Sequence, residues 1–284
     1  MISRKQSIRQ WLSWNVRRIS APIRVLPDFI IIGAQRCGTT SLYRYLCTHP
    51  AIGRAAKKEV HFFDNSFKKS INSYRIYFQT FFYKYYRQQI SHQALLTGEA
   101  SPYYLFHPLA PHRISQSLPR VKLIVLLRNP VDRAYSHYWH EVRRGKETLS
   151  FEEAIEREPE RLWGQRERLI FHDGAYYSAT HQHFSYLARG IYVDQLSVWQ
   201  RLFPKEQFLI LRSEEFYADP ATTLNRIFAF LNLPSWSRTD DTIYNHSDYP
   251  SMTMTTKKQL ADYFRPHNER LYEFLGQDFG WESQ

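Results

Sequence analysis

The chain has 284 residues, enough for one large domain or for one domain with a small appendage. Hydrophobic residues make up 43% of it, an ordinary share for a globular protein that buries a core. The net charge of +11 indicates an anionic partner, which leaves nucleic acid, a membrane surface and an acidic small molecule as candidates. Aromatic residues reach 16%, and aromatic faces commonly hold sugar rings, although core and surface packing explain any single one.

The first 27 residues carry more than half of the excess charge, because they contain six basic residues and no acidic one. Apolar residues recur at helical spacing within this tail: Ile8, Trp11, Leu12, Val16 and Ile19. The tail has no apolar stretch long enough to span a bilayer and no secretory core. We therefore expect a basic amphipathic segment over residues 1–27, which either lies on a membrane surface or folds against the domain.

The elements that follow alternate between strands and helices. Short apolar runs predict buried strands at 28–33, 121–127 and 207–211. Helical patterns cover 42–47, 131–144, 192–203, 221–231 and 256–275, and the charge-rich segment 149–168 is typical of a solvated helix. This order predicts an α/β fold over residues 28–284: a single domain with a central parallel sheet flanked by helices.

Two cysteines, Cys37 and Cys47, flank the first predicted helix. A helix of this length holds their backbones roughly 15 Å apart, too far for a disulfide. No spacing of Cys and His resembles a zinc site, so we expect no metal centre of that kind.

A glycine-containing loop joins the first strand to the first helix, with the sequence Gly33-Ala-Gln-Arg36-Cys37-Gly38-Thr39-Thr40. Such a strand–loop–helix arrangement presents backbone N–H groups to an anion, and it predicts a P-loop-like phosphate-binding loop. In loops that bind nucleoside triphosphates a Lys stands at the position of Thr39. Here the positive charge comes from Arg36, inside the loop. Helix capping by the two threonines explains part of the pattern equally well.

Arg128 follows the second predicted strand, where an ATPase would carry an Asp that holds Mg²⁺. A cation at that position cannot hold a metal, but it can bind another phosphate. The two features together favour a nucleotide with a second, separate phosphate and no catalytic metal.

These motifs resemble those of the carbohydrate sulfotransferases that use 3′-phosphoadenosine 5′-phosphosulfate (PAPS), and within them the heparan sulfate N- and O-sulfotransferases and their bacterial relatives. The loop at 33–40 resembles the family's 5′-phosphosulfate loop, and the stretch from Arg128 to Ser136 resembles its 3′-phosphate motif. The segment Lys58-Glu59-Val-His61-Phe-Phe-Asp64 resembles the part that carries the general base, and the ending up to Trp281 resembles the terminal helix.

The resemblance implies transfer of a sulfuryl group from PAPS to a hydroxyl or amine of a carbohydrate. It implies a catalytic set of Glu59 as the base, with His61 sharing or orienting that base and Arg36 acting on the phosphosulfate. The implied donor-binding residues are Arg36, Cys37, Gly38, Thr39, Thr40, Arg128 and Ser136. Asp64 is implied to hold the acceptor. Arg is not a proton donor, so the role of Arg36 is electrostatic.

Two departures from the family concern substrates. Ala100 stands where members that modify glycosaminoglycans often carry a Lys near the acceptor, and 245–249 replaces a basic loop that closes over the cofactor in some members. The stretch 74–87 mixes aromatic rings with cations, as a cleft for an acidic sugar or a packed amphipathic helix would.

Two other functions stay open on the sequence alone: a P-loop kinase or ATPase, and a basic nucleic-acid-binding protein. Thr39 and Arg128 speak against the first, and the absence of any helix-turn-helix or zinc pattern speaks against the second. We expect a cytoplasmic sulfotransferase whose partner is a carbohydrate or polysaccharide rather than nucleic acid, with residues 1–27 as the candidate for peripheral contact with an anionic membrane.

Overall fold

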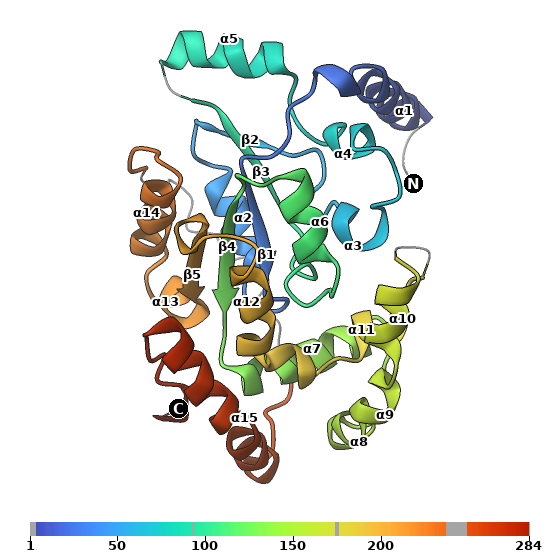
Figure 1. The fold of residues 1–284 in the computed structure, drawn as a ribbon, viewed down its shortest axis with the longest axis vertical. Coiled ribbons are helices and arrows are strands. Elements are labelled where there is room, and N and C mark those ends of the chain that lie inside the picture. Colours follow the sequence, from blue (N-terminus) through green and yellow to red (C-terminus); the bar gives the residue numbers. More distant parts are fainter. Residues whose placement is uncertain (1–3, 93, 174–175, 237–248, 284) are drawn as a thin grey trace.

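The computed structural model describes residues 4–92, 94–173, 176–236 and 249–283. Its centre is a five-stranded parallel sheet in the order β2-β3-β1-β4-β5. The strands are β1 (Phe29–Gly33), β2 (Ile52–Arg54), β3 (Leu96–Ala100), β4 (Lys122–Leu127) and β5 (Phe208–Arg212). Helices cover both faces of the sheet (Figure 1). The expected single α/β domain with a parallel sheet is confirmed.

The central strands form because their sequences are apolar on both faces. Every residue of β1 is buried, as is all of β4 except Lys122. Strands covered on both faces need such continuous apolar runs, which is why β1, β4 and β5 could be predicted. β2 and β3 were not predicted, because β2 has only three residues and β3 reads Leu-Thr-Gly-Glu-Ala.

The helices that surround the sheet are α2 (Thr39–Leu46), α6 (Ala110–Ser117), α7 (Pro130–Arg143), α12 (Tyr192–Gln200), α13 (Ser213–Ala218), α14 (Pro220–Phe230) and α15 (Met254–Leu275). Of these, α2, α7, α12, α14 and α15 agree with the predicted ones to within a few residues, whereas α6 and α13 had no predicted range. Asn129 caps α7 by accepting a hydrogen bond from the backbone N–H of Val131, and Gly276 ends α15 in the left-handed conformation. The two cysteines at the ends of α2 are free, as expected.

The charge-rich segment 149–168 differs from the prediction of one solvated helix. It forms α8 (Phe151–Glu156), α9 (Glu158–Leu162) and the start of α10 (Gln165–Phe171), and α11 (Ala179–His183) follows. Glu158 is buried and accepts hydrogen bonds from the backbone N–H groups of Leu187 and Ala188. The segment breaks at this carboxylate because it ties the chain to a distant loop, a contact that sequence periodicity does not carry.

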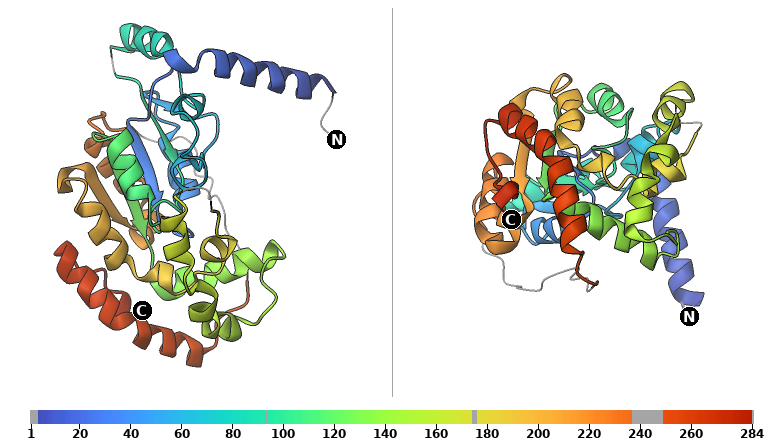
Figure 2. Two further views of the ribbon diagram at one scale, coloured as in Figure 1. Left: turned by 45° about the vertical axis from the view of Figure 1, so that its right-hand side comes forward. Right: turned by 90° about the horizontal axis from the view of Figure 1, so that it is seen from below.

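The beginning of the chain and the stretch after α3 (Phe62–Asn65) lie at one end of the molecule (Figures 1 and 2). α1 (Arg4–Ile19) and a short 3₁₀ turn, η1 (Ala21–Ile23), run into β1, while α4 (Asn72–Arg75) and α5 (Phe81–Ser91) run into β3. The stretch 74–87, expected to form a cleft for an acidic sugar or a packed amphipathic helix, is divided between the end of α4, a turn and most of α5. Tyr74 is fully buried, and α5 has no buried residue and lies on the outside.

Candidate active site

The predicted phosphate-binding loop (residues 33–40) and the predicted base, Glu59, line the same cavity, which has a volume of about 1040 Å³. A cavity of that size can take a nucleotide together with part of a second substrate. The loop stands at the carboxyl end of β1, and Arg128 follows the carboxyl end of β4, so the parallel sheet brings both to one edge. The sequence-predicted residues on the cavity wall are Arg36, Gly38, Thr39, Thr40, Glu59, His61, Arg128 and Ser136.

The loop needs glycine at position 38. Gly38 has a φ of 92°, and a Cβ there would lie 2.7 Å from the hydroxyl of Tyr217. No side chain caps the N-terminus of α2 at this residue, so the first N–H groups of the helix face the cavity without a capping partner. Arg36 also takes a left-handed conformation, with a φ of 73°, which is uncommon for a residue with a side chain. The loop backbone is thus shaped for an anion rather than for a cap.

Cys37 differs from its neighbours in the loop, because its side chain is fully buried. Burial raises the pKa of its thiol to about 11. Its Sγ lies 3.9 Å from the hydroxyl of Tyr192, and its backbone N–H donates to the carbonyl of Ala34. Cys37 therefore supports the loop from behind and does not line the cavity.

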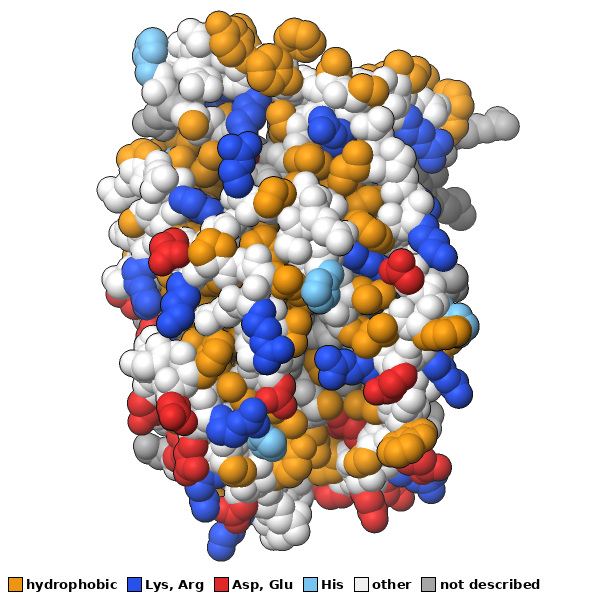
Figure 3. Space-filling model, in the orientation of Figure 1, with side chains coloured by type: hydrophobic (Ala, Val, Ile, Leu, Met, Phe, Trp, Pro, Cys, Tyr) orange, Lys and Arg blue, Asp and Glu red, His pale blue; other side chains and the backbone are white. Residues whose placement is uncertain are grey.

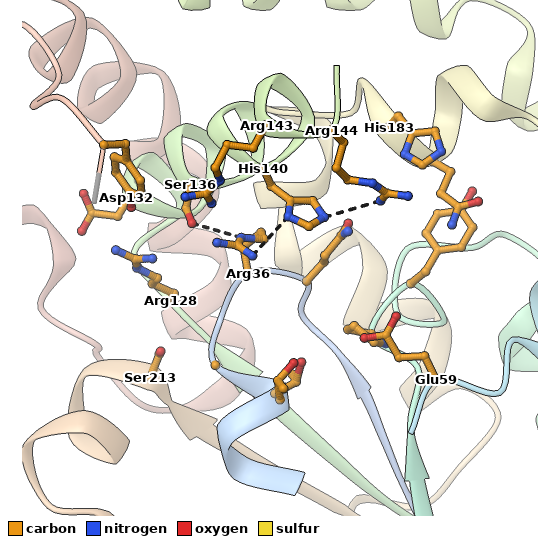
Figure 4. A pocket seen from close by; sticks show the side chains of 18 of the residues that line it. Arg36, Glu59, Arg128, Asp132, Ser136, His140, Arg143, Arg144, His183 and Ser213 are labelled. Atoms are coloured by element: carbon orange, nitrogen blue, oxygen red, sulfur yellow. Dashed lines mark hydrogen bonds between the residues drawn. The ribbon is translucent and has the colours of Figure 1, made fainter. Parts of the chain in front are cut away.

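Arg36 and Arg128 form a cationic group on the α7 side of the cavity (Figure 4). The guanidinium of Arg36 donates to the hydroxyl of Ser136 at 3.1 Å and lies 3.5 Å from Nδ1 of His140. Burial lowers the pKa of Arg36, and the charges of Arg143 and Arg128 lower it further. An anion in this part of the cavity would relieve that repulsion.

Glu59 and His61 face the cavity from the segment that links β2 to α3 (Figure 4 shows Glu59 across the cavity from Arg36). His61 lies between two carboxylates: its Nδ1 is 2.6 Å from Asp64, and its Nε2 is 3.4 Å from Glu59. Burial opposes charge on these groups, but the carboxylates outweigh it and raise the pKa of His61 to about 10. Likewise the hydrogen bond from His61 and the charge of Lys58 outweigh burial and lower the pKa of Glu59 to about 2. At neutral pH the arrangement is an imidazolium between two carboxylates.

Asp64 is not on the cavity wall, because its carboxylate is fully buried. It bonds to His61 and accepts a hydrogen bond from the backbone N–H of Asn65. The structure therefore places this predicted acceptor-binding residue behind His61, where it fixes the orientation of the imidazole.

Lys58 is a functional candidate that the sequence did not single out. Its ammonium donates to the hydroxyl of Thr40 at 2.6 Å and lies 2.7 Å from the carboxylate of Glu59. It therefore joins the predicted phosphate-binding loop to the predicted base, and its place beside Glu59 in the sequence was the signal for it. Other cavity residues come from distant parts of the chain and had no sequence signal: His140, Arg143, Arg144, His183 and Tyr217.

Ala100 is fully buried at the end of β3, so a side chain at this position is not presented to an acceptor without rearrangement. Of the expected replacement for a basic loop at 245–249, residues 245–248 lie outside the described residues. Tyr249 lines the cavity, and its ring stacks on that of Trp139 in α7. Within the described parts of the chain, no group of three or more His, Cys, Asp or Glu residues could hold a metal ion.

The parallel α/β sheet with a glycine loop, two arginines and a carboxylate around one cavity defines a P-loop-like domain. The chain matches the Sulfotransferase domain family over residues 26–282 and belongs to that family. The predicted sulfotransferase is thereby confirmed over the kinase or ATPase alternative.

Known proteins similar to the chain carry the same function. A sulfotransferase from Alicyclobacillus acidocaldarius, known from its crystal structure, is 31% identical with a TM-score of 0.68, and the match covers 92% of this chain and 100% of that one. The membrane-associated sulfotransferase kil1 of Dictyostelium discoideum is 26% identical over 93% of this chain and 68% of its own length. Heparan sulfate glucosamine 3-O-sulfotransferase 3A1 of Mus musculus is 29% identical over 91% of this chain and 65% of its own length. The chain thus spans about two thirds of these two relatives.

Proposed function

We propose that this sulfotransferase uses PAPS as its donor and a hydroxyl or amine of a carbohydrate as its acceptor. One observation carries the proposal: a single cavity has an anion-shaped loop with two arginines on one side and an ionised carboxylate on the other. Relatives named for heparan sulfate support the carbohydrate acceptor.

The residues around the loop fit a donor with two separated phosphate positions. Thr39, Thr40 and the N–H groups at the start of α2 would hold the 5′-phosphosulfate, and Arg128 with Ser136 would hold the 3′-phosphate. Arg36 bonds to Ser136, so its charge serves the 3′-phosphate side as well as the loop. When bound, the donor supplies the sulfuryl group and leaves as 3′,5′-adenosine bisphosphate.

Glu59 would accept the proton of the attacking hydroxyl or amine while the new bond to sulfur forms and the bond from sulfur to the leaving phosphate oxygen breaks. His61 orients this carboxylate, and Asp64 in turn orients His61. Lys58 holds positive charge between Glu59 and Thr40, where it can stabilise charge on the leaving phosphate. In this scheme His61 and Asp64 are positioning residues.

We also propose that α1 contacts an anionic membrane surface and that the protein acts in the cytoplasm. In the described part of the chain no helix has the length and apolar character needed to cross a bilayer. Leu12, Val16 and Ile19, at i, i+4 and i+7, are exposed, while Trp14 packs on Tyr77 and Arg17 donates to the carbonyl of Ile76. The apolar stripe thus points away from the domain, as a lipid-facing helix requires.

The test of the chemical step is Glu59→Gln, which keeps the shape of the side chain and removes the proton acceptor. With radiolabelled PAPS and a panel of polysaccharides and small glycans, we expect kcat to fall by about 10²–10⁴. Donor affinity should hold, because Glu59 makes no proposed contact with the nucleotide. Near wild-type turnover on the true acceptor would refute Glu59 as the base.

Two controls accompany this variant. Glu160→Gln removes an exposed carboxylate on α9 and should leave turnover unchanged. Arg36→Ala removes charge from the donor side, so both rate and donor binding should fall. Activity that disappears in EDTA would contradict a reaction without metal.

A further inference from the structure

A charge count over the chain points to a second feature at the end of the molecule that carries α1. Residues 65–98 contain five basic residues and no acidic one, as residues 1–27 contain six and none. The rest of the chain has 27 basic and 27 acidic residues, so these two segments hold the whole net charge of +11. An excess confined in this way marks a surface for an anionic partner.

The fold joins the two segments although they are far apart in sequence. The backbones of Arg24 and Thr80 form a bridge, and the guanidinium of Arg75 donates to the carbonyl of Arg24 at 2.6 Å. α1, η1 and α5 all lie at the same end of the molecule (Figures 1 and 2).

α5 is built like α1, with one face fastened to the domain and the other free. Its Lys84 pairs with Asp28 at 2.8 Å, and Arg87 lies on the same face at i+3. Phe82, Tyr86 and Ile90, at i, i+4 and i+8, are 60–65% exposed. Figure 3 shows hydrophobic side chains gathered over α5 at this end. A helix that exposes such residues in a monomer needs a partner for them.

We propose that α5, together with η1 and α1, forms a docking surface for an anionic lipid bilayer; the inference extends the membrane contact proposed for α1. We define this docking surface by Trp11, Leu12, Val16, Ile19, Ile23, Phe81, Phe82, Tyr86 and Ile90. Among residues 11–27 and 65–98, the exposed cations are Arg18, Lys68 and Lys69. Aromatic side chains settle at the headgroup level of a bilayer and aliphatic ones below it, while Lys and Arg bind anionic headgroups.

The mixture of residues selects a bilayer over other anionic partners. Nucleic acid and soluble polysaccharide would use the cations, but exposed Leu, Val and Ile would gain little from them. A second copy of the chain would bring two acid-free basic surfaces together, and like charges repel.

The test measures binding of the full chain to phosphatidylcholine vesicles with and without phosphatidylserine, in the absence of donor. We expect sedimentation with the anionic vesicles only, weakened by added salt. Equal binding to both kinds of vesicle, or to neither, would overturn the proposal.

Phe82→Ser with Tyr86→Ser tests α5 itself, and we expect the affinity for anionic vesicles to fall at least about tenfold. The matched control is Trp163→Ser with Phe171→Ser, which removes two aromatics that are each 84% exposed but lie outside the docking surface. Loss of binding in the control, or its retention in the α5 variant, would refute the role of α5. Unchanged thermal unfolding shows that each variant is folded.

The charge is tested with two lysine pairs. Lys68→Gln with Lys69→Gln should weaken binding several-fold, whereas Lys257→Gln with Lys258→Gln, an equal loss of charge on α15, should not. Equal losses would overturn the charge assignment.

Three further readouts separate this inference from its alternatives. Turnover on a soluble acceptor should stay unchanged in the α5 variant. Vesicle binding by a protein that shows no transferase activity would refute the proposed donor and acceptor but would leave the docking surface supported. A chain without residues 1–19 that still binds vesicles, and loses that binding with the α5 change, supports α5 alone. Duplex DNA binding as tight as vesicle binding, or a dimer that the α5 change dissolves, would replace the bilayer with another partner.

Discussion

His61 illustrates how a single residue determines the protonation of the site. Both of its ring nitrogens face carboxylates, and its pKa of about 10 makes it an imidazolium at neutral pH. An imidazolium cannot take a proton from the acceptor, which favours Glu59 over His61 as the proposed base. The sequence left both possibilities open, because the spacing Glu-x-His does not tell which group holds the proton.

The pH dependence of the rate follows from this pair. In the wild type, as long as the protein stays folded, kcat/KM should fall at low pH only as the pH approaches the Glu59 pKa of about 2. His61→Gln removes a hydrogen bond and a charge that favour the carboxylate, so the pKa of Glu59 rises and the acid limb moves to higher pH. A pH profile of kcat/KM measures this shift. An acid limb that stays in place would contradict the pairing.

Stability should depend on pH through the same two residues. The lowered pKa of Glu59 stabilises the fold above its unfolded pKa, and this contribution is lost as pH falls toward about 2. The raised pKa of His61 stabilises the fold below its unfolded pKa, and this contribution is lost as pH rises through about 10. The difference in Tm between wild type and His61→Gln should therefore be largest near pH 5–6 and shrink toward pH 10, as calorimetry would show.

Arg128 gives a residue-scale test of the donor. Its charge-assisted bonds to the 3′-phosphate should contribute about 1.5–3 kcal/mol, so Arg128→Ala should weaken binding of 3′,5′-adenosine bisphosphate by roughly 10–100-fold. Adenosine 5′-phosphosulfate lacks that phosphate and should bind almost as before. Titration calorimetry measures the affinity of both ligands for wild type and Arg128→Ala. Equal losses of affinity for the two ligands would refute the contact between Arg128 and the 3′-phosphate.

At the scale of elements, β3 holds the catalytic segment in place through a buried carboxylate. Glu99 accepts hydrogen bonds from the backbone N–H of Val60 and from the hydroxyls of Ser101, Tyr74 and Tyr104. Ser101 in turn accepts a hydrogen bond from the backbone N–H of His61, which has a strained φ of 57°. The segment that carries the proposed base Glu59 is therefore positioned by a strand to which it does not belong.

Glu99→Gln should lower kcat while donor affinity holds, because its amide cannot satisfy all four donors and the segment 58–62 loosens. The cost in unfolding free energy should be about 1–3 kcal/mol. Tyr74→Phe is the control, since it removes a donor from the carboxylate oxygen that faces away from Val60. It should lower Tm but retain most of kcat; parallel losses of kcat in the two variants would reduce Glu99 to a purely structural role.

Glu99 also shows where prediction from sequence ends. Apolar strands and the glycine loop were visible because their signal is local, and so were Glu59, Arg36 and Arg128 as parts of motifs. β3 carries a charged residue at a fully buried position, which is possible only because tyrosines from elsewhere in the chain donate to it. The outward face of α5 and the site residues on α7 and α11 likewise depend on how distant segments pack.

At the scale of the whole molecule, the boundary between the tail and the domain at residue 27 stays a prediction. The contacts of residues 24 and 25 favour a boundary earlier in the chain. Arg24 is buried and donates to the carbonyl of Phe78, and the backbone N–H of Val25 donates to Gln79. Removal of residues 1–19 strips the ring contact between Trp14 and Tyr77 and the hydrogen bond from Arg17 to Ile76, but it keeps the bonds of Arg24 and Val25, so Tm should fall less than on removal of 1–27. Removal of 1–27 strips these bonds, and each lost kcal/mol lowers Tm by roughly 2–4 °C in a domain of this size. Equal Tm values for the two truncated chains would contradict this division.

The ion pair between Lys84 and Asp28 fastens α5 to the residue just before β1, while the predicted phosphate-binding loop begins where β1 ends. β1 has five residues and spans about 17 Å, so the sheet acts as a spacer between the docking surface and the site of transfer. An enzyme seated on a bilayer through α5 would work at that height above the headgroups. It would reach groups that stand out into the water, such as the sugars of a glycan chain, and pass over hydroxyls that lie at the lipid surface itself.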